Sequence, residues 1–274
     1  MSIRDYAITF ACYNQLDYTK RCLESLIKSG VDPARIVAVD NLSSDGTQDY
    51  LLGQSLGQVI LNRDNFGCGV AWNQGALALQ AEWTIVMNND VVVSANWLEG
   101  LLSGAERHRL LVASPAMIEG DLDYDLEEMA VRGSSLLGTH IRMQLPHAVC
   151  MAIHHSVWKT VGFFRATPRL LGYEDGIFFN ALARDRVTSG TVGSSWIHHF
   201  GSITQKAMKQ ERQMDQAAAL GDRLHPELGR KSWLNRKIKK LQARALVSSC
   251  RTRELSQSDM SLHAERRDGQ YKWL

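Results

Sequence analysis

The sequence has neither paired cysteines nor an apolar run long enough to span a membrane. Its five cysteines are scattered along 274 residues and form no CxxC pair. This spacing argues against a disulfide framework or a zinc site, and it is typical of a protein kept in a reducing compartment. No stretch approaches the ~18 apolar residues that a transmembrane helix requires. The first residues, MSIRDYAITFACYN, show no signal peptide, so we expect a cytoplasmic protein.

Several motifs of phosphate-binding and hydrolytic enzymes are also missing. The segment Phe66–Gly69 is not followed by the Gly-Lys-Ser/Thr of a Walker A loop, and it is not a GxGxxG fingerprint. No Ser/His/Asp or Cys/His arrangement indicates a covalent nucleophile. The glycine- and lysine-rich signature expected near the N-terminus of a nucleotidyltransferase is absent from ACYNQLDYTK.

Charge is divided unevenly along the chain. Residues 206–274 carry 16 Lys or Arg against 8 Asp or Glu, whereas residues 1–205 carry 15 against 21. An acidic region tolerates bound cations, while a basic one favours anionic partners. We therefore expect a catalytic domain over residues 1–205 and a basic, helical C-terminal extension over residues 206–274.

Short β-rich runs alternate with helical patterns through the first two-thirds of the chain. This order predicts an α/β fold with a mostly parallel sheet flanked by helices on both faces. From about Ile203 onward the pattern is helical, with little left to build a sheet. Strands are expected at Tyr6–Ala11, Ile36–Asp40, Val59–Asn62, Trp83–Met87, Ala148–His154 and Ser195–His199, and a later helix at Asp175–Arg184.

Polar side chains follow each of the first four predicted strands. The clusters are Tyr13-Asn14, Asp40-Asn41, the segment 62–65, and the segment 88–90. Ligands of an open parallel sheet bind beyond the carboxyl ends of its strands. Four polar strand ends on one edge therefore predict a binding rim, although turns favour Asn and Asp in any case.

Taken in order, these segments resemble the family 2 glycosyltransferases of the GT-A fold, which is a Rossmann-like architecture. The resemblance extends over residues 6–204, and within the family it points to rhamnosyltransferase-like enzymes. It is carried by FACYNQLDYTKRCLESL, VDNLSSDGTQDYL, NRDNFGCGVAWNQG, NNDV, GYEDGIFFNALAR and HHFGSIT.

The resemblance implies a divalent cation, Mg²⁺ or Mn²⁺, held by Asp90 and His199. A diphosphate leaving group needs a hard cation, and such cations prefer carboxylate oxygen. The family often has an acid at the position of Asn88, so Asp90 is left as the principal carboxylate. The alternative for NNDV is an Asn-rich turn after a strand. The neighbouring His198 aligns less well with the family pattern than His199.

The resemblance also implies that Asp175 is the general base and that Glu174 is an orienting or acceptor-binding neighbour. The alternative for this pair is an acidic helix start that complements the helix dipole. Asp40 would accept the N3–H of uracil or thymine, whereas Asp45 suits a helix cap. The further donor-binding positions that the resemblance implies are Ala11, Tyr13, Asn65, Gly67, Asn73 and Asn89.

These features predict an inverting glycosyltransferase that uses a UDP- or dTDP-sugar and a glycan or lipid-linked acceptor in polysaccharide or cell-surface glycan assembly. The alternatives are a nucleotidyltransferase on a similar sheet and a non-catalytic scaffold on membrane or nucleic acid; no nucleic-acid partner is expected. Residues 230–253 contain nine Lys or Arg, no acid and an apolar stripe at helical spacing. This segment either binds an anionic membrane surface peripherally or packs on the body, and the pattern fits both.

Overall fold

Apolar side chains at alternating positions build the central strands and fix which helices cover them. In the computed structural model, which describes residues 5–166, 174–201, 203 and 233–274, β1 (Tyr6–Cys12) and β2 (Ile36–Asp40) are buried on both faces. Ile36 and Ala38 belong to one hydrophobic cluster, while Val37 and Val39 belong to another on the opposite face. A sheet buried on both faces needs helices on both sides, as in α/β proteins.

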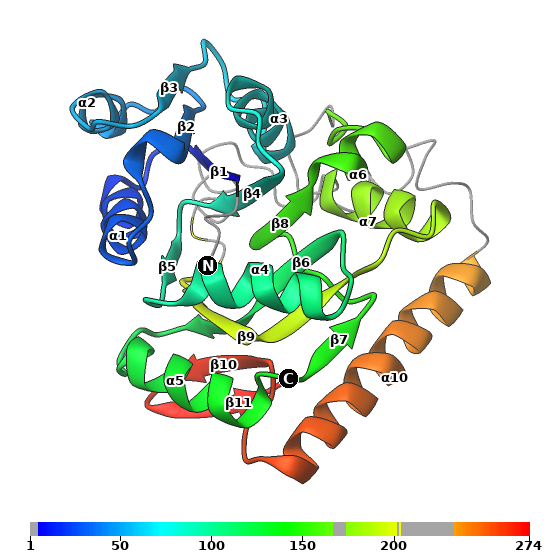
Figure 1. The fold of residues 1–274 in the computed structure, drawn as a ribbon. Coiled ribbons are helices and arrows are strands. Elements are labelled where there is room, and N and C mark those ends of the chain that lie inside the picture. Colours follow the sequence, from blue (N-terminus) through cyan, green and yellow to red (C-terminus); the bar gives the residue numbers. More distant parts are fainter. Residues whose placement is uncertain (1–4, 167–173, 202, 204–232) are drawn as a thin grey trace.

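Two groups of helices supply these layers (Figure 1). The first cluster contains apolar side chains of α1 (Leu16–Lys28) and α4 (Trp97–Arg107). The opposite cluster contains those of α3 (Cys68–Ala78), α6 (His155–Thr160) and α7 (Glu174–Arg184). The helices on both faces were predicted from the sequence and are confirmed. Shorter helices are η1 (Pro33–Arg35) and α2 (Thr47–Leu52).

The described residues form an eleven-stranded sheet with the order β11-β10-β6-β8-β4-β1-β2-β3, and β9 pairs with β5, β6 and β7. The neighbours β3, β2, β1 and β4 run parallel, as predicted. Beyond β4 the sheet is mixed, because β8 lies antiparallel between β4 and β6. The remaining strands are β3 (Gln58–Leu61), β4 (Trp83–Asn88), β5 (Val91–Val93), β6 (Val112–Gly120), β7 (Ile141–Met143), β8 (Cys150–His154), β9 (Ser189–His199), β10 (His263–Arg267) and β11 (Gln270–Trp273).

The C-terminal part differs from the prediction that little remained there to build a sheet. β10 pairs parallel with β6, and β11 folds back on β10 as an antiparallel hairpin. The two residues of the turn, Asp268 and Gly269, both have positive φ, which the tight hairpin turn requires. The sequence of β10, HAERR, shows no hydrophobic pattern typical of a strand, because Ala264 is its only fully buried residue. The Asp-Gly pair was the available signal.

Helix is confirmed for α10 (Trp233–Gln257), which follows residues 204–232 that lie outside the described part. The hairpin and α5 (Leu126–Leu137) share a third hydrophobic cluster built around Trp196, Met260 and Leu262. None of the helices in the described ranges combines the length and the apolar character that crossing a membrane demands.

A buried ion pair ties the end of α10 to the body. The Arg142 guanidinium on β7 donates Nε to Oε1 of Glu254 at 2.9 Å and Nη2 to Oε2 at 2.8 Å. The same Nη2 donates to the carbonyl oxygen of Leu274 at 2.7 Å. Glu254 in turn accepts the backbone N–H of Leu262 at 3.0 Å. One guanidinium therefore connects the sheet, the helix and the C-terminal hairpin.

Removing one member of this pair should destabilise the protein far more than removing an exposed charge. We expect Arg142→Ala to lower the free energy of unfolding by about 3–5 kcal/mol, because it leaves the Glu254 carboxylate buried without its counter-charge. The matched control is Arg132→Ala, which removes an exposed ion pair with Asp259 and should cost about 1 kcal/mol or less. Urea denaturation measures both, and equal losses would contradict the assigned role.

The difference in the free energy of unfolding between wild type and Arg142→Ala should become smaller at acidic pH. Burial alone would raise the pKa of Glu254, but hydrogen bonds and the charge of Arg142 lower it below its ordinary value. A carboxyl with a lowered folded pKa contributes stability above its unfolded pKa, about 4.3, and loses it as the pH falls through the folded value. Denaturation midpoints recorded from pH 7 down to acid test this trend.

Candidate active site

The polar strand ends meet at one edge of the sheet, as the sequence predicts. Strand register places Cys12 beside Asp40, and Asp40 beside Leu61. On the other side of β1, Ala11 lies beside Asn88. The carboxyl ends of β1, β2, β3 and β4 therefore form a continuous rim.

Asp40 ends β2 with its side chain fully buried. Its Oδ1 accepts the backbone N–H of Ser43 at 2.9 Å and the Gln48 Nε2 at 2.7 Å. Its Oδ2 is buried and has no hydrogen-bond partner within the described part of the chain. A buried carboxylate oxygen left unsatisfied is costly, so this atom is suited to accept a hydrogen bond from a ligand.

The loops after β1 and β2 are bonded to each other. The backbone N–H of Asn14 donates to Ser43 Oγ at 2.7 Å, and Asn14 Oδ1 accepts the N–H of Ser44 at 2.8 Å. Asp45 accepts the N–H groups of Leu16 at 2.9 Å and Thr47 at 3.2 Å. Asp45 thus joins the starts of α1 and α2, in agreement with the structural role predicted for it.

Side-chain amides shape the start of α3. Asn65 Oδ1 accepts the N–H of Gly67 at 3.0 Å, and the Gly67 carbonyl accepts Asn41 Nδ2 at 3.3 Å. Gly67 has a φ of 86°, a conformation that suits glycine. The predicted donor-binding residues Asn65 and Gly67 therefore lie together on this turn.

Two further residues predicted to bind the donor, Asn73 and Asn89, form hydrogen bonds to other residues of the chain through their side-chain amides. Asn73 donates Nδ2 to the carbonyl of Phe164 at 2.6 Å and accepts the N–H of Phe164 at 3.0 Å. Asn89 donates to Thr19 Oγ1 at 2.9 Å. Asn73 therefore holds the chain just before residues 167–173, which lie outside the described part, and Asn89 ties the end of β4 to α1.

Asp90 and His199 come together across the β5–β9 pairing, and both are only 2% exposed. His199 Nε2 lies 3.3 Å from Asp90 Oδ1, and His199 Nδ1 lies 3.4 Å from Glu119 Oε2. Burial alone would lower the pKa of His199, but the hydrogen bonds and charges of the two carboxylates outweigh it and raise the pKa to about 9. Glu119 was not predicted from the sequence. β6 was not predicted, so the pairing of Glu119 with His199 across β6 and β9 could not be inferred.

This donor set fits a divalent cation only in part. Among the described residues no group of three His, Cys, Asp or Glu side chains is arranged to hold an ion by itself. A carboxylate oxygen and an imidazole nitrogen are nevertheless suitable ligands for Mn²⁺, and Mg²⁺ sites often use one or two carboxylates together with substrate phosphates. Asp90 and His199 would thus hold a cation whose remaining ligands come from a phosphate and water.

His198 has a different environment. It is fully buried, and its Nδ1 lies 3.0 Å from the Tyr124 hydroxyl. Burial and the neighbouring His199 lower the pKa of His198 to about 4, so the ring is neutral at physiological pH. The structure therefore favours His199 over His198 as the residue that faces Asp90.

Glu174 and Asp175 form the first turn of α7, and Glu174 packs against the start of α3. A Cβ at Gly69 would lie 3.0 Å from Glu174 Cβ and Cγ, so the two helix starts approach this closely because residue 69 is glycine. Asp175 is half-buried, and its burial raises the pKa of its carboxyl. A raised pKa suits a general base.

The thiol of Cys68 is influenced by acidic side chains from both the sheet edge and α7. Burial, together with the negative charges of Glu174, Asp90 and Asp175, raises the pKa of Cys68, at the start of α3, to about 12. Glu174 approaches the start of α3 at Gly69, and the charges of Asp90 and Asp175 also act on the Cys68 thiol there.

Comparisons with known proteins identify the family and the fold of the chain. The family model described as Glycosyl transferase family 2 matches residues 8–166, more than half of the chain. No curated protein matches the chain. Asp175, His199 and the C-terminal hairpin lie outside the residues that the model matches.

Solved structures show the same fold at low identity. A structure of GalNAc-T7 with UDP, GalNAc and Mn²⁺ has a TM-score of 0.56 and 15% identity over 72% of this chain and 44% of that chain. A mannosyltransferase, PcManGT from Pyrobaculum calidifontis, in complex with GDP-Man and Mn²⁺, has a TM-score of 0.56 and 13% identity over 77% and 61%. The chain therefore covers less than two thirds of the length of either structure.

Proposed function

The chain belongs to glycosyl transferase family 2, and from this we propose that it is an inverting, metal-dependent enzyme that transfers a sugar from a UDP- or dTDP-sugar to an acceptor hydroxyl. Its mixed α/β architecture is that of the GT-A glycosyltransferases. The observations that carry the proposal are the family match over residues 8–166 and the contact of Asp90 with His199 at the edge of the sheet. Family membership argues for sugar transfer over the nucleotidyltransferase and scaffold alternatives.

In the proposed reaction, Asp175 removes the proton from the acceptor hydroxyl while that oxygen attacks the anomeric carbon in a single displacement. Burial raises the pKa of this carboxyl above its ordinary value, which makes the carboxylate a stronger base. Glu174, packed on Gly69, fixes the first turn of α7 and so the position of its neighbour. A Mg²⁺ or Mn²⁺ ion held by Asp90 and His199 would neutralise charge on the leaving diphosphate.

The choice of nucleotide is assigned to Asp40. The two similar structures contain UDP in one case and GDP-Man in the other, so the fold accommodates different bases. Selection must then come from this chain's own residues. The buried Oδ2 of Asp40 is an acceptor without a donor among the described residues, and uracil or thymine would supply that donor as N3–H.

The acceptor is proposed to be a glycan or a lipid-linked glycan in polysaccharide or cell-surface assembly. Membrane attachment through residues 230–253 stays a prediction, since residues 230–232 lie outside the described part. Within α10, Leu241 and Leu246 are exposed, as is Arg244, which is compatible with a peripheral contact. Salt-sensitive sedimentation with anionic vesicles is the measurement that decides this point.

The enzyme class is tested by the release of nucleotide from UDP-sugars. We expect turnover that stops with EDTA and returns with Mn²⁺ or Mg²⁺, because the leaving diphosphate then regains its counter-charge. Asp90→Asn should abolish turnover, whereas Glu106→Gln, a change of an exposed acid on α4, should retain it. Undiminished activity in chelator would refute the metal requirement.

Loss of the base should slow chemistry and spare donor binding. Asp175→Asn is expected to lower kcat by about 10²–10⁴-fold with little change in the KM for the donor. The control, Asp185→Asn, removes a half-buried carboxylate that pairs with Arg184 just beyond the other end of α7, and it should behave as wild type. Because burial raises the pKa of Asp175, the acid limb of the pH–rate profile should lie above the ordinary range of Asp. A wild-type rate in Asp175→Asn would reassign the base.

Nucleotide preference should depend on Asp40. The amide of Asp40→Asn presents an N–H where the base also presents one, so the affinity for UDP and dTDP should fall by about 10–100-fold. ADP binding should change little, and Asp49→Asn, an exposed acid on α2, serves as control. Calorimetric titration measures all three nucleotides. Equal binding of the three by the wild-type protein would remove Asp40 from base recognition.

A further inference from the structure

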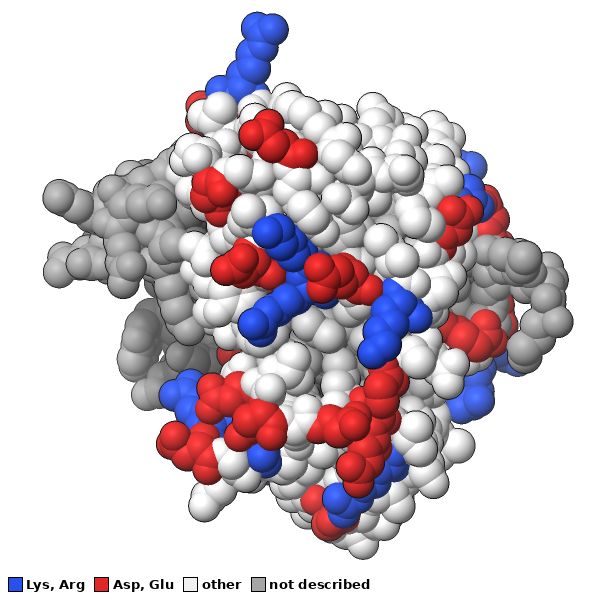
Figure 2. Space-filling view, turned by 90° about the vertical axis from the view of Figure 1, so that its left-hand side faces the viewer, with Lys and Arg blue, Asp and Glu red and all other residues white. Residues whose placement is uncertain are grey.

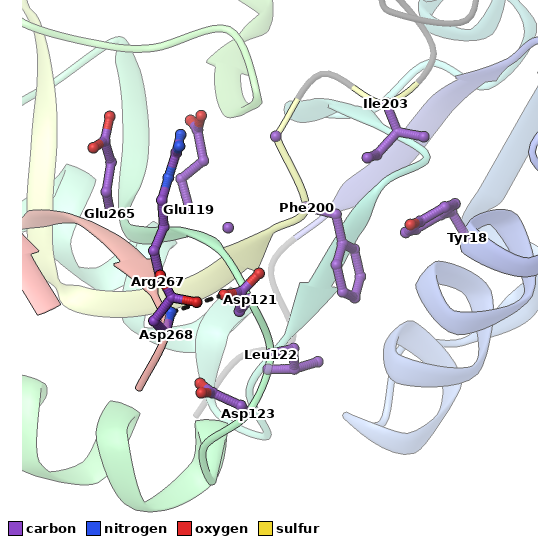
Figure 3. A pocket seen from close by; sticks show the side chains of 12 residues that line it. Tyr18, Glu119, Asp121, Leu122, Asp123, Phe200, Ile203, Glu265, Arg267 and Asp268 are labelled. Atoms are coloured by element: carbon purple, nitrogen blue, oxygen red, sulfur yellow. Dashed lines mark hydrogen bonds between the residues drawn. The ribbon is translucent and has the colours of Figure 1, made fainter. Parts of the chain in front are cut away.

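A pocket of about 600 Å³ opens at the ends of β6 and β9, beside the turn of the C-terminal hairpin (Figure 3). It adjoins the Asp90 centre, because its wall residue Glu119 lies 3.4 Å from His199. The backbone of its opposite wall is bonded to Asp90 directly. The Phe200 N–H donates to the Asp90 carbonyl at 3.0 Å, and the Ile203 N–H donates to Asp90 Oδ2 at 3.2 Å.

One wall of the pocket is polar and carries an excess of carboxylates. Glu119 and Asp121 flank Gly120, the last residue of β6, while Glu265, Arg267 and Asp268 come from the hairpin. The turn is held against this wall, since the Asp268 N–H donates to Asp121 Oδ2 at 3.2 Å. The carboxylates can accept hydrogen bonds from hydroxyl or ammonium groups, whereas they repel an anionic ligand.

The surrounding surface has a similar character. On the face shown in Figure 2, acidic side chains gather in the lower half, with Lys and Arg interspersed. Some of the charge near the pocket is neutralised locally, because Arg266 pairs with Asp123 at 2.7 Å and Lys272 pairs with Glu265 at 3.2 Å. The surplus of carboxylates in the pocket remains.

The opposite wall is apolar and aromatic. Phe200 and Tyr18 meet edge to face with ring centroids 5.0 Å apart, and Leu122 and Ile203 lie on the same pocket. In Figure 3 these four side chains stand apart from Glu265, Glu119 and Arg267. Concave sites lined by aromatic and apolar groups with a few polar groups bind small ligands that have both kinds of surface. A pyranose ring has such surfaces, with hydroxyls at its edge and C–H groups on its face.

We propose that this pocket binds one sugar unit of the acceptor, either neutral or bearing an amine, and that the β10–β11 hairpin selects it. The inference rests on the proposed transfer of a sugar to an acceptor. The hairpin residues lie outside the residues that the family model matches, whereas Glu119 and Asp121 lie within them. An acidic sugar, such as a uronic acid, is rejected by the carboxylates.

Two methyl-bearing residues of the pocket allow a direct test of binding. Protein labelled at Ile and Leu methyl groups is titrated with methyl glycosides of glucose, galactose, mannose and rhamnose, with methyl glucosaminide, and with methyl glucuronide. We expect at least one neutral or amine-bearing glycoside to shift the methyl signals of both Leu122 and Ile203 in a saturable way at millimolar concentration. The glucuronide should bind at least about tenfold more weakly.

The role of the hairpin is tested with variants in the same experiment. The double variant Glu265→Gln, Arg267→Ala should weaken binding about tenfold, because it removes charged hydrogen-bonding groups. Gln270→Ala, an exposed change on the same hairpin, should bind as wild type. Unchanged methyl signals far from the pocket report that each variant is folded.

Three results would overturn the proposal: no glycoside of the panel shifts the two signals, the glucuronide binds as tightly as the others, or the double variant binds as wild type. The test is separable from that of the enzyme's function. Glycoside binding by a wild-type protein that turns over no nucleotide-sugar would refute the proposed function and keep the pocket. Turnover of a nucleotide-sugar by a protein that binds none of the glycosides would support the proposed function and refute the sugar-binding role of the pocket.

Discussion

The site depends on one buried imidazole that is shared by two carboxylates. His199 is almost inaccessible to solvent, and both of its ring nitrogens face acids, Asp90 on one side and Glu119 on the other. A buried carboxylate without a counter-charge would cost several kcal/mol, so Asp90 and His199 must stay together for the sheet edge to close. Because they come from the segment between β4 and β5 and from β9, this requirement ties the C-terminal half of the sheet to the N-terminal half.

Around that centre the rim divides into two kinds of polar residue. Asn41, Asn65 and Asn73 use their amides to hold backbone in place. Asp40 keeps one buried carboxylate oxygen without a hydrogen-bond partner among the described residues, and burial raises the pKa of the Asp175 carboxyl. Rigid turns built from amides let a small number of carboxylates act at defined positions, which is the requirement for a preorganised site.

The parts of the fold that were predictable are those with a local signal. β2 was predicted at its observed bounds because IVAVD is a continuous apolar run ending in an acid. Asp90 and His199 were predicted as a pair from strand ends and motif order, and the structure brings their side chains into contact. β6 was missed because VASPAMIEG contains Pro115 and small residues, and its strand shows a register shift at that proline. Glu119 and the Asn73–Phe164 bonds depend on contacts between distant segments, for which a single sequence carries no periodic signal.

The pairing of β10 with β6 also has a kinetic consequence. Met117 lies beside His263 in the finished sheet, so a large part of the chain must be in place before this contact can form. Contacts between residues so distant in sequence form slowly, because the chain entropy of closing a long loop opposes them. Until the hairpin arrives, one side of β6 presents unpaired backbone groups, which can pair with another chain. During synthesis this edge exists well before its partner strand does, so the nascent protein passes through a stage in which aggregation competes with completion of the sheet.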